Sequence, residues 1–239
     1  MTWVWRSLPR NDLLADWRIV SIQISIASIE TVGGIMSKQA HQHLINTSMR
    51  RYSEVHKLVC ENGILYLEKS AGESLFDFLA KVVTSQQLSN SAASTIFSRV
   101  KNAASATDLS LIDFVDAKNN HRLASCGLSR NKVKALFALK AAFSQGVLCE
   151  GEVSSPTYAD ISQRITSIWG LGQWSADMAA IFYYGLQDVW SEGDMSLQRG
   201  ISALTGVTPK QGMSVVSSFS PYKSFLALHI WKGVDEGVF

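Results

Sequence analysis

Apolar residues recur at helical spacing from about Ser37 to the end of the chain. Ile161, Ile165 and Ile168 illustrate the pattern, because they occupy positions i, i+4 and i+7 of one predicted helix. Ser155, followed by Pro156, is the predicted N-cap of this helix. The predicted helices cover residues 38–48, 74–84, 89–102, 108–115, 119–124, 130–145, 157–168, 173–184, 195–204, 209–217 and 221–233. The pattern therefore predicts an all-α domain.

The first 35 residues follow a different pattern. Isoleucines alternate with polar residues over 22–26, which favours a strand, and two glycines then interrupt it. The segment is interpreted as an appended arm or as a translated leader upstream of a start near Met36, and the sequence leaves both open. The predicted domains are an amino-terminal arm at 1–35 and a helical domain at 36–239, with a helical hairpin at 157–184.

The composition indicates a folded, globular protein. Of 239 residues, 46% are hydrophobic and 18% are charged, which is too apolar for a disordered chain. The most apolar early stretch, Ile19–Ile29, is too short to span a bilayer, and neither a transmembrane helix nor a secretory signal is predicted. The cysteines Cys60, Cys126 and Cys149 are far apart, which favours reduced thiols over a disulfide framework or an iron–sulfur cluster.

Charge is distributed unevenly along the chain. The net charge is only +2, but residues 118–149 contain basic residues and no acidic one. The basic residues are Lys118, Arg122, Arg130, Lys132, Lys134 and Lys140. Such a run suits either a solvated helix face or a surface that faces phosphates. Ser129 is a predicted N-cap, and the cations after it oppose the helix dipole unless an anion binds there.

The sequence Gly170-Leu171-Gly172 separates two predicted helices. We expect both glycines to adopt backbone angles that a Cβ atom would forbid, giving a tight hairpin with Leu171 directed inward. The second helix would then begin with unpaired N–H groups that a phosphate can approach closely. The same residues also suit an ordinary connection between helices, so the hairpin alone does not establish DNA binding.

Four segments carry motifs that occur in one order along the chain. They are GLGQWSADMAAIFYYGLQDVWSEGDMSLQRGI from Gly170, SQQLS at 85–89 with the helix after it, CGLSRNK at 126–132, and FSPYKS at 219–224 leading to a helix that contains Trp231. Together they resemble the helix-hairpin-helix, Gly/Pro-Asp DNA glycosylases, in particular the branch that removes alkylated bases such as 3-methyladenine. The resemblance covers about residues 40–233. It implies an all-α, two-lobed fold with the active-site cleft between the lobes.

The resemblance implies that Asp194, which follows the second hairpin helix, is catalytic. Breaking an N-glycosidic bond develops oxocarbenium character on the deoxyribose, and a fixed carboxylate stabilises that charge and can orient the attacking water. Asp194 is also a predicted N-cap for the helix from Met195, and the two roles are compatible. The neighbouring carboxylates of Asp177, Asp188 and Glu192 do not stand at the motif position of the catalytic residue and are interpreted as structural or solvent-facing.

The residue after the hairpin also bears on the reaction. Bifunctional members of the family carry a nucleophilic lysine where this chain has Trp174, so a Schiff-base lyase lacks its amine and hydrolysis alone is expected. Trp174 and Trp231 match the family's pocket tryptophans, whose faces attract cationic alkylpurines. Tyr222 and Trp190 are weaker pocket candidates, with a core aromatic as the alternative. Met178 replaces the family's pocket tyrosine and leaves the range of bases open.

Contacts to DNA are expected at three places. The gap left by a flipped base would be filled by Gln87 or Leu88, unless these residues only pack on or cap the following helix. The hairpin amides would hold phosphates, and basic side chains would add contacts unless they are merely surface residues. The candidate DNA-binding residues are Gly170, Leu171, Gly172, Trp174, Gln87, Leu88, Arg130, Lys132 and Lys134. The resemblance implies no cofactor, but allows a structural monovalent cation at the hairpin carbonyls.

The sequence thus predicts a monofunctional glycosylase that removes alkylated purines from double-stranded DNA and leaves an abasic site. A glycosylase for uracil or deaminated bases and a non-catalytic DNA-binding module are the alternatives. A monomer is expected, with no membrane association, located in the cytoplasm with the nucleoid or in a nucleus. The histidines His41, His43, His121 and His229 are interpreted as packed or solvated, without a catalytic role.

Overall fold

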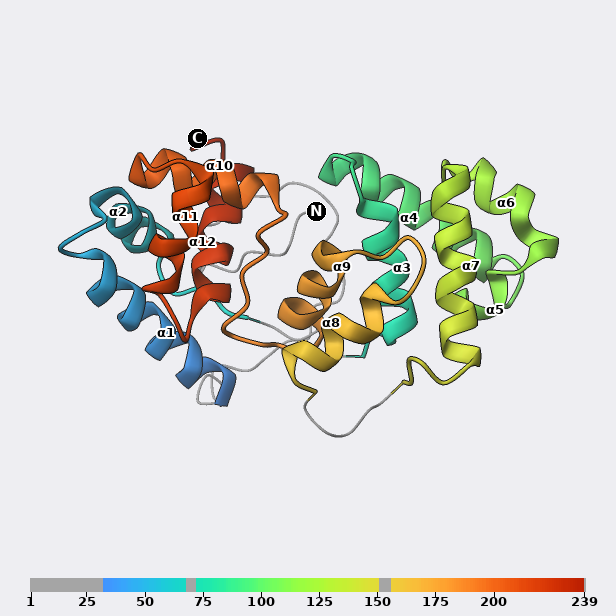
Figure 1. Cartoon of the computed structure of the whole chain (residues 1–239). Helices are drawn as coiled ribbons and strands as arrows, with labels where there is room; N and C mark the ends of the chain where they lie inside the picture. The colour runs from blue at the N-terminus through green and yellow to red at the C-terminus, as the bar shows by residue number, and fades with distance from the viewer. Residues whose placement is uncertain (1–31, 68–71, 151–155, 239) are drawn as a thin grey trace. The chain divides into compact units, whose positions relative to one another are not determined.

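The computed structural model describes residues 32–67, 72–150 and 156–238, and within them every regular element is helical (Figure 1). The α-helices are α1 (Val32–Ser48), α2 (Ser53–Asn62), α3 (Leu75–Ser85), α4 (Asn90–Ser105), α5 (Leu111–Phe114), α6 (Asn120–Ser125), α7 (Arg130–Ser144), α8 (Tyr158–Thr166), α9 (Gln173–Met178), α10 (Met195–Thr205), α11 (Pro209–Ser217) and α12 (Lys223–Asp235). A 3-10 helix, η2 (Ala117–Asn119), precedes α6, and a π-helix, η3 (Ala179–Tyr183), follows α9. The predicted all-α fold is confirmed, whereas the strand predicted at 22–26 lies outside the described residues.

The described residues form two compact units. The hairpin unit comprises residues 72–150 and 156–194, and the terminal unit comprises residues 32–67 and 195–238. The boundary between the units falls directly after Asp194, the predicted catalytic residue. Helix α1 begins at Val32, so it includes residues that the sequence assigned to an amino-terminal arm.

The hairpin unit is built around α3, which is buried along most of its length and contacts α4, α5, α7, α9 and η3. Ser74 caps this helix by accepting a hydrogen bond from the Asp77 amide. The carboxylate of Glu150 accepts two more, from the amides of Leu75 at 2.8 Å and Phe76 at 3.1 Å. These bonds satisfy amides at the start of α3 that the helix itself leaves unpaired. They stabilise the helix against which α9 packs.

The ends of the hairpin helices differ from the prediction. The sequence suggested Ser155 as the cap of the first helix, but the cap is Thr157, which forms a capping box with Asp160. The second helix was predicted as one segment over 173–184, but α9 ends at Met178 and the π-helix η3 continues it. The predicted cap Ser129 is confirmed, because its hydroxyl accepts the Lys132 amide.

The terminal unit surrounds α12, which contacts α1, α2 and α10 and is almost entirely buried. Helix α2 was missed by the sequence analysis. Its buried residues Val55, Leu58 and Val59 have helical spacing, but Tyr52 at its start provides no side-chain cap. Among the residues that the structure describes, none of the helices combines the length and apolarity needed to cross a membrane.

Candidate active site

The hairpin turn joins α8 to α9 and packs on α7. The amide of Leu171 donates to the carbonyl of Ile168 at 3.1 Å, and the Leu171 side chain is buried, as predicted. Gly170 has a φ of 87°, and a Cβ atom there would lie 2.6 Å from the Cβ of Ala135. Both the backbone conformation and the close contact with α7 therefore require glycine at this position.

Gly172 is different, and the prediction that its backbone excludes a Cβ atom was wrong. Its φ is −105°, which any residue can adopt, and a Cβ atom would meet no heavy atom within 4 Å. Gly172 is exposed and is the N-cap of α9, with no side chain capping the helix. The amides of Gln173 and Trp174, at the start of α9, have no partner within the helix and are available to an anion.

The predicted catalytic carboxylate is held by a predicted pocket residue. The indole Nε1 of Trp174 donates to Oδ2 of Asp194 at 2.9 Å, and both side chains are half-buried. The amide of Asp194 donates to the carbonyl of Ser191 at 3.1 Å, which closes a turn. The sequence placed these residues in one site but did not predict this hydrogen bond, because nothing local fixes the direction of an indole N–H.

The loop at 86–89 has the sequence QQLS and is named here the QQxS loop. It is attached to the hairpin through Gln86, which the sequence did not single out. Nε2 of Gln86 donates to the carbonyl of Gly170 at 3.0 Å and to the hydroxyl of Ser175 at 3.2 Å. Gln87 has a φ of 56°, which is unusual for a residue with a side chain, and both Gln87 and Leu88 are exposed. Ser89 caps α4, so Gln87 and Leu88 are not needed for that purpose. Their role as a wedge stays a prediction.

The basic candidates on α7 have different surroundings. Nζ of Lys132 donates to the carbonyl of Thr84 at 2.8 Å, and burial lowers the pKa of this lysine. Nζ of Lys134 lies 4.0 Å from the ring centroid of Trp169, which is 45% exposed, while Arg130 is exposed. Lys132 thus has a structural contact that the sequence did not indicate, and Trp169 is an exposed aromatic residue that the analysis overlooked.

The other pocket candidates are divided between the units. Met178 and Trp190 are buried in the hairpin unit, which also holds Trp174 and Asp194. Trp231 is buried on α12, and Tyr222 directly precedes that helix. The ring of Tyr222 packs edge-on against His43 of α1, with ring centroids 5.3 Å apart.

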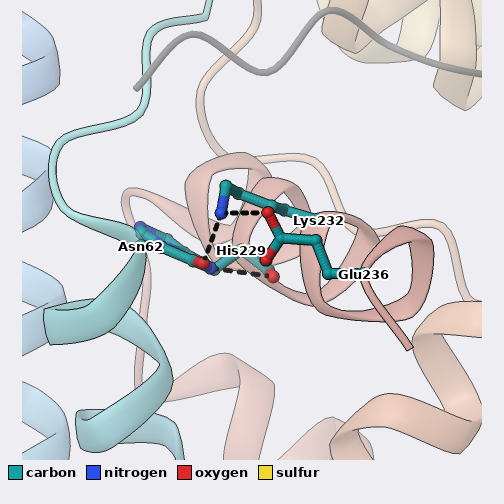
Figure 2. Close-up of polar contacts among 4 residues, drawn as sticks. All are labelled: Asn62, His229, Lys232 and Glu236. Carbon is teal, nitrogen blue, oxygen red and sulfur yellow. Dashed lines mark hydrogen bonds and ion pairs between the residues drawn. The ribbon is translucent and has the colours of Figure 1, made fainter. Parts of the chain in front are cut away.

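Figure 2 shows the polar cluster that fixes the part of α12 around Trp231. Nζ of Lys232 donates to Oδ1 of Asn62 at 3.1 Å and to Oε1 of Glu236 at 2.6 Å. Nδ2 of Asn62 donates to the carbonyl oxygen of His229 at 3.2 Å and lies 3.1 Å from its Nδ1. Because Lys232 can only donate, Oδ1 of Asn62 must face it, and Nδ1 of His229 must then be an unprotonated acceptor.

Burial is the main cause of an unusually low pKa for His229, about 3, and His41 and Lys232 lower it further. The ring is therefore neutral near pH 7, and its bond to Asn62 explains why a histidine is present. This agrees with the interpretation of His229 as a packed residue. Within the described residues, no group of three or more His, Cys, Asp and Glu side chains is arranged to hold a metal ion.

Comparison with known proteins connects these features. No family model matches the chain. DNA-3-methyladenine glycosylase 1 of Schizosaccharomyces pombe is 25% identical over 162 residues, which are 66% of this chain and 71% of the relative. The DNA-3-methyladenine glycosylase of Saccharomyces cerevisiae is 30% identical over 176 residues, 70% of this chain and 60% of the relative.

Solved structures give the same result for the fold. The Schizosaccharomyces pombe 3-methyladenine DNA glycosylase Mag1, in complex with abasic DNA, matches with a TM-score of 0.71 at 22% identity, over 82% of this chain and 97% of that one. A DNA-3-methyladenine glycosidase from Bacillus halodurans matches with a TM-score of 0.65 at 25% identity, over 80% and 88% of the chains. This chain belongs to the helix-hairpin-helix 3-methyladenine DNA glycosylase family.

One helix of the hairpin carries two features of the candidate site. Here the same helix, α9, supplies both the uncapped amides and the indole that holds Asp194. The individual site assignments remain predictions that rest on the geometry and on the matched motifs.

Proposed function

We propose that the protein is a monofunctional DNA glycosylase of base excision repair, which hydrolyses the N-glycosidic bond of alkylated purines in duplex DNA. The proposed substrates are 3-methyladenine and 7-methylguanine, and the product is an abasic site. The observation that carries the proposal is the 2.9 Å hydrogen bond from Trp174 to Asp194, beside the hairpin of a chain in this family.

The chemistry follows from the charges of substrate and site. A purine alkylated at N3 or N7 carries positive charge, so it departs with the bonding electron pair without needing a strong general acid. Positive charge then develops on the sugar, where the carboxylate of Asp194 stabilises it and orients a water molecule for attack at C1′. Trp174 occupies the lysine position of bifunctional relatives, so hydrolysis is the proposed outcome.

In the hairpin unit, the indole face of Trp174 is proposed to hold the base, with Trp190 as a further candidate. The matched motifs also make Trp231 and Tyr222 of the terminal unit pocket candidates. Cation–π attraction would favour the charged base over normal purines. Met178 is buried and forms a softer wall than the tyrosine of the family. The base spectrum should therefore differ from that of relatives with a tyrosine.

The proposed partner is double-stranded damaged DNA, bound by a monomer. The exposed hairpin amides, the QQxS loop and the basic residues of α7 would contact it, with Gln87 or Leu88 filling the gap. The enzyme would act where the DNA is, in the nucleoid or in a nucleus.

A structural monovalent cation at the hairpin remains part of the proposal. The carbonyls of Ile168 and Gly170 each accept one hydrogen bond, from Leu171 and from Gln86. A carbonyl oxygen has two lone pairs, so both could still bind a cation. Such an ion would neutralise phosphate charge, and no step of the hydrolysis depends on it.

The experiment that tests the function measures free bases released from methylated duplex DNA by the wild-type protein and by Asp194→Asn, with chromatography to identify them. We expect 3-methyladenine or 7-methylguanine from the wild type, and a rate lower by about 1,000-fold or more in the variant, as for loss of a main electrostatic stabiliser. The affinity for DNA containing an abasic site should change little.

Two other outcomes would change the proposal. Near-normal release by Asp194→Asn would mean that a different carboxylate acts. No release by the wild type, with DNA binding intact, would direct attention to uracil and deaminated purines, and then to a non-catalytic DNA-binding module.

A further inference from the structure

Asp177 is a buried carboxylate that the proposed chemistry does not use. It lies on α9 and is only 1% exposed. Oδ1 accepts hydrogen bonds from the hydroxyl of Tyr158 at 2.6 Å and from Nε2 of Gln173 at 3.0 Å. Oδ2 accepts one from the hydroxyl of Ser191 at 2.7 Å. A buried charge is costly unless hydrogen bonds satisfy it, so these neutral donors hold the carboxylate in one orientation.

The third of these donors connects Asp177 to the proposed catalytic residue. Ser191 is fully buried and begins the turn that ends at Asp194, which we name the carboxylate turn (residues 191–194). The carbonyl of Ser191 accepts the Asp194 amide at 3.1 Å, so Ser191 contributes to fixing the backbone of Asp194.

Helix α9 therefore contacts both ends of the carboxylate turn. Asp177 holds the Ser191 hydroxyl, and one helical turn earlier Trp174 holds the Asp194 carboxylate. Residues at i and i+3 lie on the same helix face, so both contacts come from one rigid surface.

We propose that Asp177 is a positioning residue, which acts through Ser191 to hold the Asp194 carboxylate where the sugar cation forms. The inference rests on the proposed function and assigns a purpose to a carboxylate that does not stand at the motif position of the candidate catalytic residue. A carboxylate suits this position because it only accepts, and so obliges the hydroxyls of Tyr158 and Ser191 to donate. Burial and the bond to Asp177 raise the pKa of Tyr158, which keeps its hydroxyl protonated.

The first test removes only the connection, with Ser191→Ala. The matched control is Ser162→Ala, which deletes a 2.9 Å bond to Oε1 of Gln173 at the far side of the same network. We expect Ser191→Ala to lower the single-turnover excision rate by about 10- to 100-fold, because displacing a reacting group by about 1 Å costs on that order. The affinity for abasic-site DNA should not change, and Ser162→Ala should match the wild type. Equal rates in all three proteins would overturn the proposal.

Two substitutions of Asp177 separate positioning from general stability. Asp177→Asn keeps the shape and one acceptor oxygen, and should recover part of the rate lost in Asp177→Ala. In an Asp194→Asn background, Asp177→Ala should cause no further loss, because its effect passes through the missing carboxylate. A further loss of 10-fold or more in that background would show that Asp177 acts by another route.

A last measurement does not depend on activity. The indole N–H of Trp174 gives an NMR resonance that Trp174→Phe identifies. Ser191→Ala should shift this resonance and speed its exchange with water, whereas Ser162→Ala should not. If the wild type released no base, the proposed function would fail, yet this spectrum would still decide the positioning inference: an unchanged Trp174 resonance in Ser191→Ala would overturn it.

Discussion

Each unit of the protein contains a buried charged side chain, and the two are satisfied in different ways. In the hairpin unit, Asp177 accepts hydrogen bonds from neutral side chains. In the terminal unit, Lys232 donates to a neutral amide, Asn62, and to the carboxylate of Glu236, which is 52% exposed (Figure 2). The hydrogen bonds to the Asp177 carboxylate come from uncharged side chains. Lys232, in contrast, forms an ion pair with a carboxylate at the surface.

The difference indicates what each network does. The bonds of Asp177 lead to the turn that carries Asp194, so their loss should lower a rate. The bonds of Lys232 connect the end of α2 to α12, so their loss should lower the free energy of unfolding. Variants of the two networks should therefore separate catalysis from stability.

After the loss of Asp194 itself, the largest effect is expected for Trp174→Phe, which keeps an aromatic face but removes the donor to Asp194. We expect the single-turnover excision rate to fall by about 100-fold, comparable to losing one well-placed hydrogen bond in an active site. The melting temperature should stay close to that of the wild type. Base release under single-turnover conditions and a thermal melt measure the two quantities. Full activity would show that the carboxylate needs no anchor from the indole.

Gly170→Ala and Gly172→Ala separate an effect on stability from an effect on DNA binding within the hairpin. Gly170→Ala should lower the free energy of unfolding by about 2–3 kcal/mol, because φ is 87° and the new Cβ meets Ala135. Gly172→Ala should fold normally but bind DNA several-fold more weakly, since its Cβ would stand before the uncapped amides. Urea denaturation and fluorescence anisotropy are the measurements. Equal stability losses in both variants would contradict the difference in their environments.

The acid sensitivity of the terminal unit should depend on His229. Its folded pKa of about 3 lies below the unfolded value of 6.5, so the unfolded chain binds the proton more readily. Stability is therefore complete above pH 6.5 and is lost as the pH falls toward 3, with about 2 kcal/mol lost at pH 5. His229→Gln keeps an acceptor for Asn62, and its unfolding free energy should depend less on pH. If the unfolding free energies of the wild type and His229→Gln changed with pH in the same way, His229 would not be the cause of the acid sensitivity.

Lys232→Met should lower the free energy of unfolding by about 1–2 kcal/mol, because the buried carbonyl of Asn62 loses its donor. The control is Glu236→Gln, whose exposed ion pair should contribute less than about 0.5 kcal/mol. Excision measured per folded molecule should be unchanged in both. If Lys232→Met lowered the excision rate without lowering the free energy of unfolding, the contacts of Lys232 would serve catalysis and not stability. Denaturant unfolding and single-turnover kinetics give the two values.

The smallest effect is expected for Lys134→Ala, which removes the cation over Trp169. DNA affinity should fall by a few-fold, and the slope of log affinity against log salt should decrease by about one, as for a single phosphate contact. Lys101→Ala is the control, because Lys101 pairs with Asp77 at 3.1 Å. Titrations at several salt concentrations measure the slope. The same slope in both variants would mean that Lys134 does not contact DNA.

The helical fold could be predicted because its signals are local. Apolar spacing indicated most helices, and Ser129 was correctly identified as a cap. Helix α2 shows the limit, since a helix that begins at Tyr52 without a side-chain cap lacks the usual start signal. The cap of α8 was misplaced because Ser155 and Thr157 are both suitable residues close together, and only the bonds to Asp160 distinguish them.

The candidate site was predictable only in part. By itself the sequence determined the all-α class and the place of the hairpin, because spacing and residue type are written along the chain. The candidate carboxylate, Asp194, followed from the resemblance of the motifs to the glycosylase family. The tertiary structure decided that Gly170 has no room for a Cβ atom, whereas Gly172 does. It also decided that Lys132 donates a hydrogen bond to the last turn of α3, and which groups donate to Asp177. Such facts depend on distances between residues far apart in the chain, and these exist only after the helices have packed.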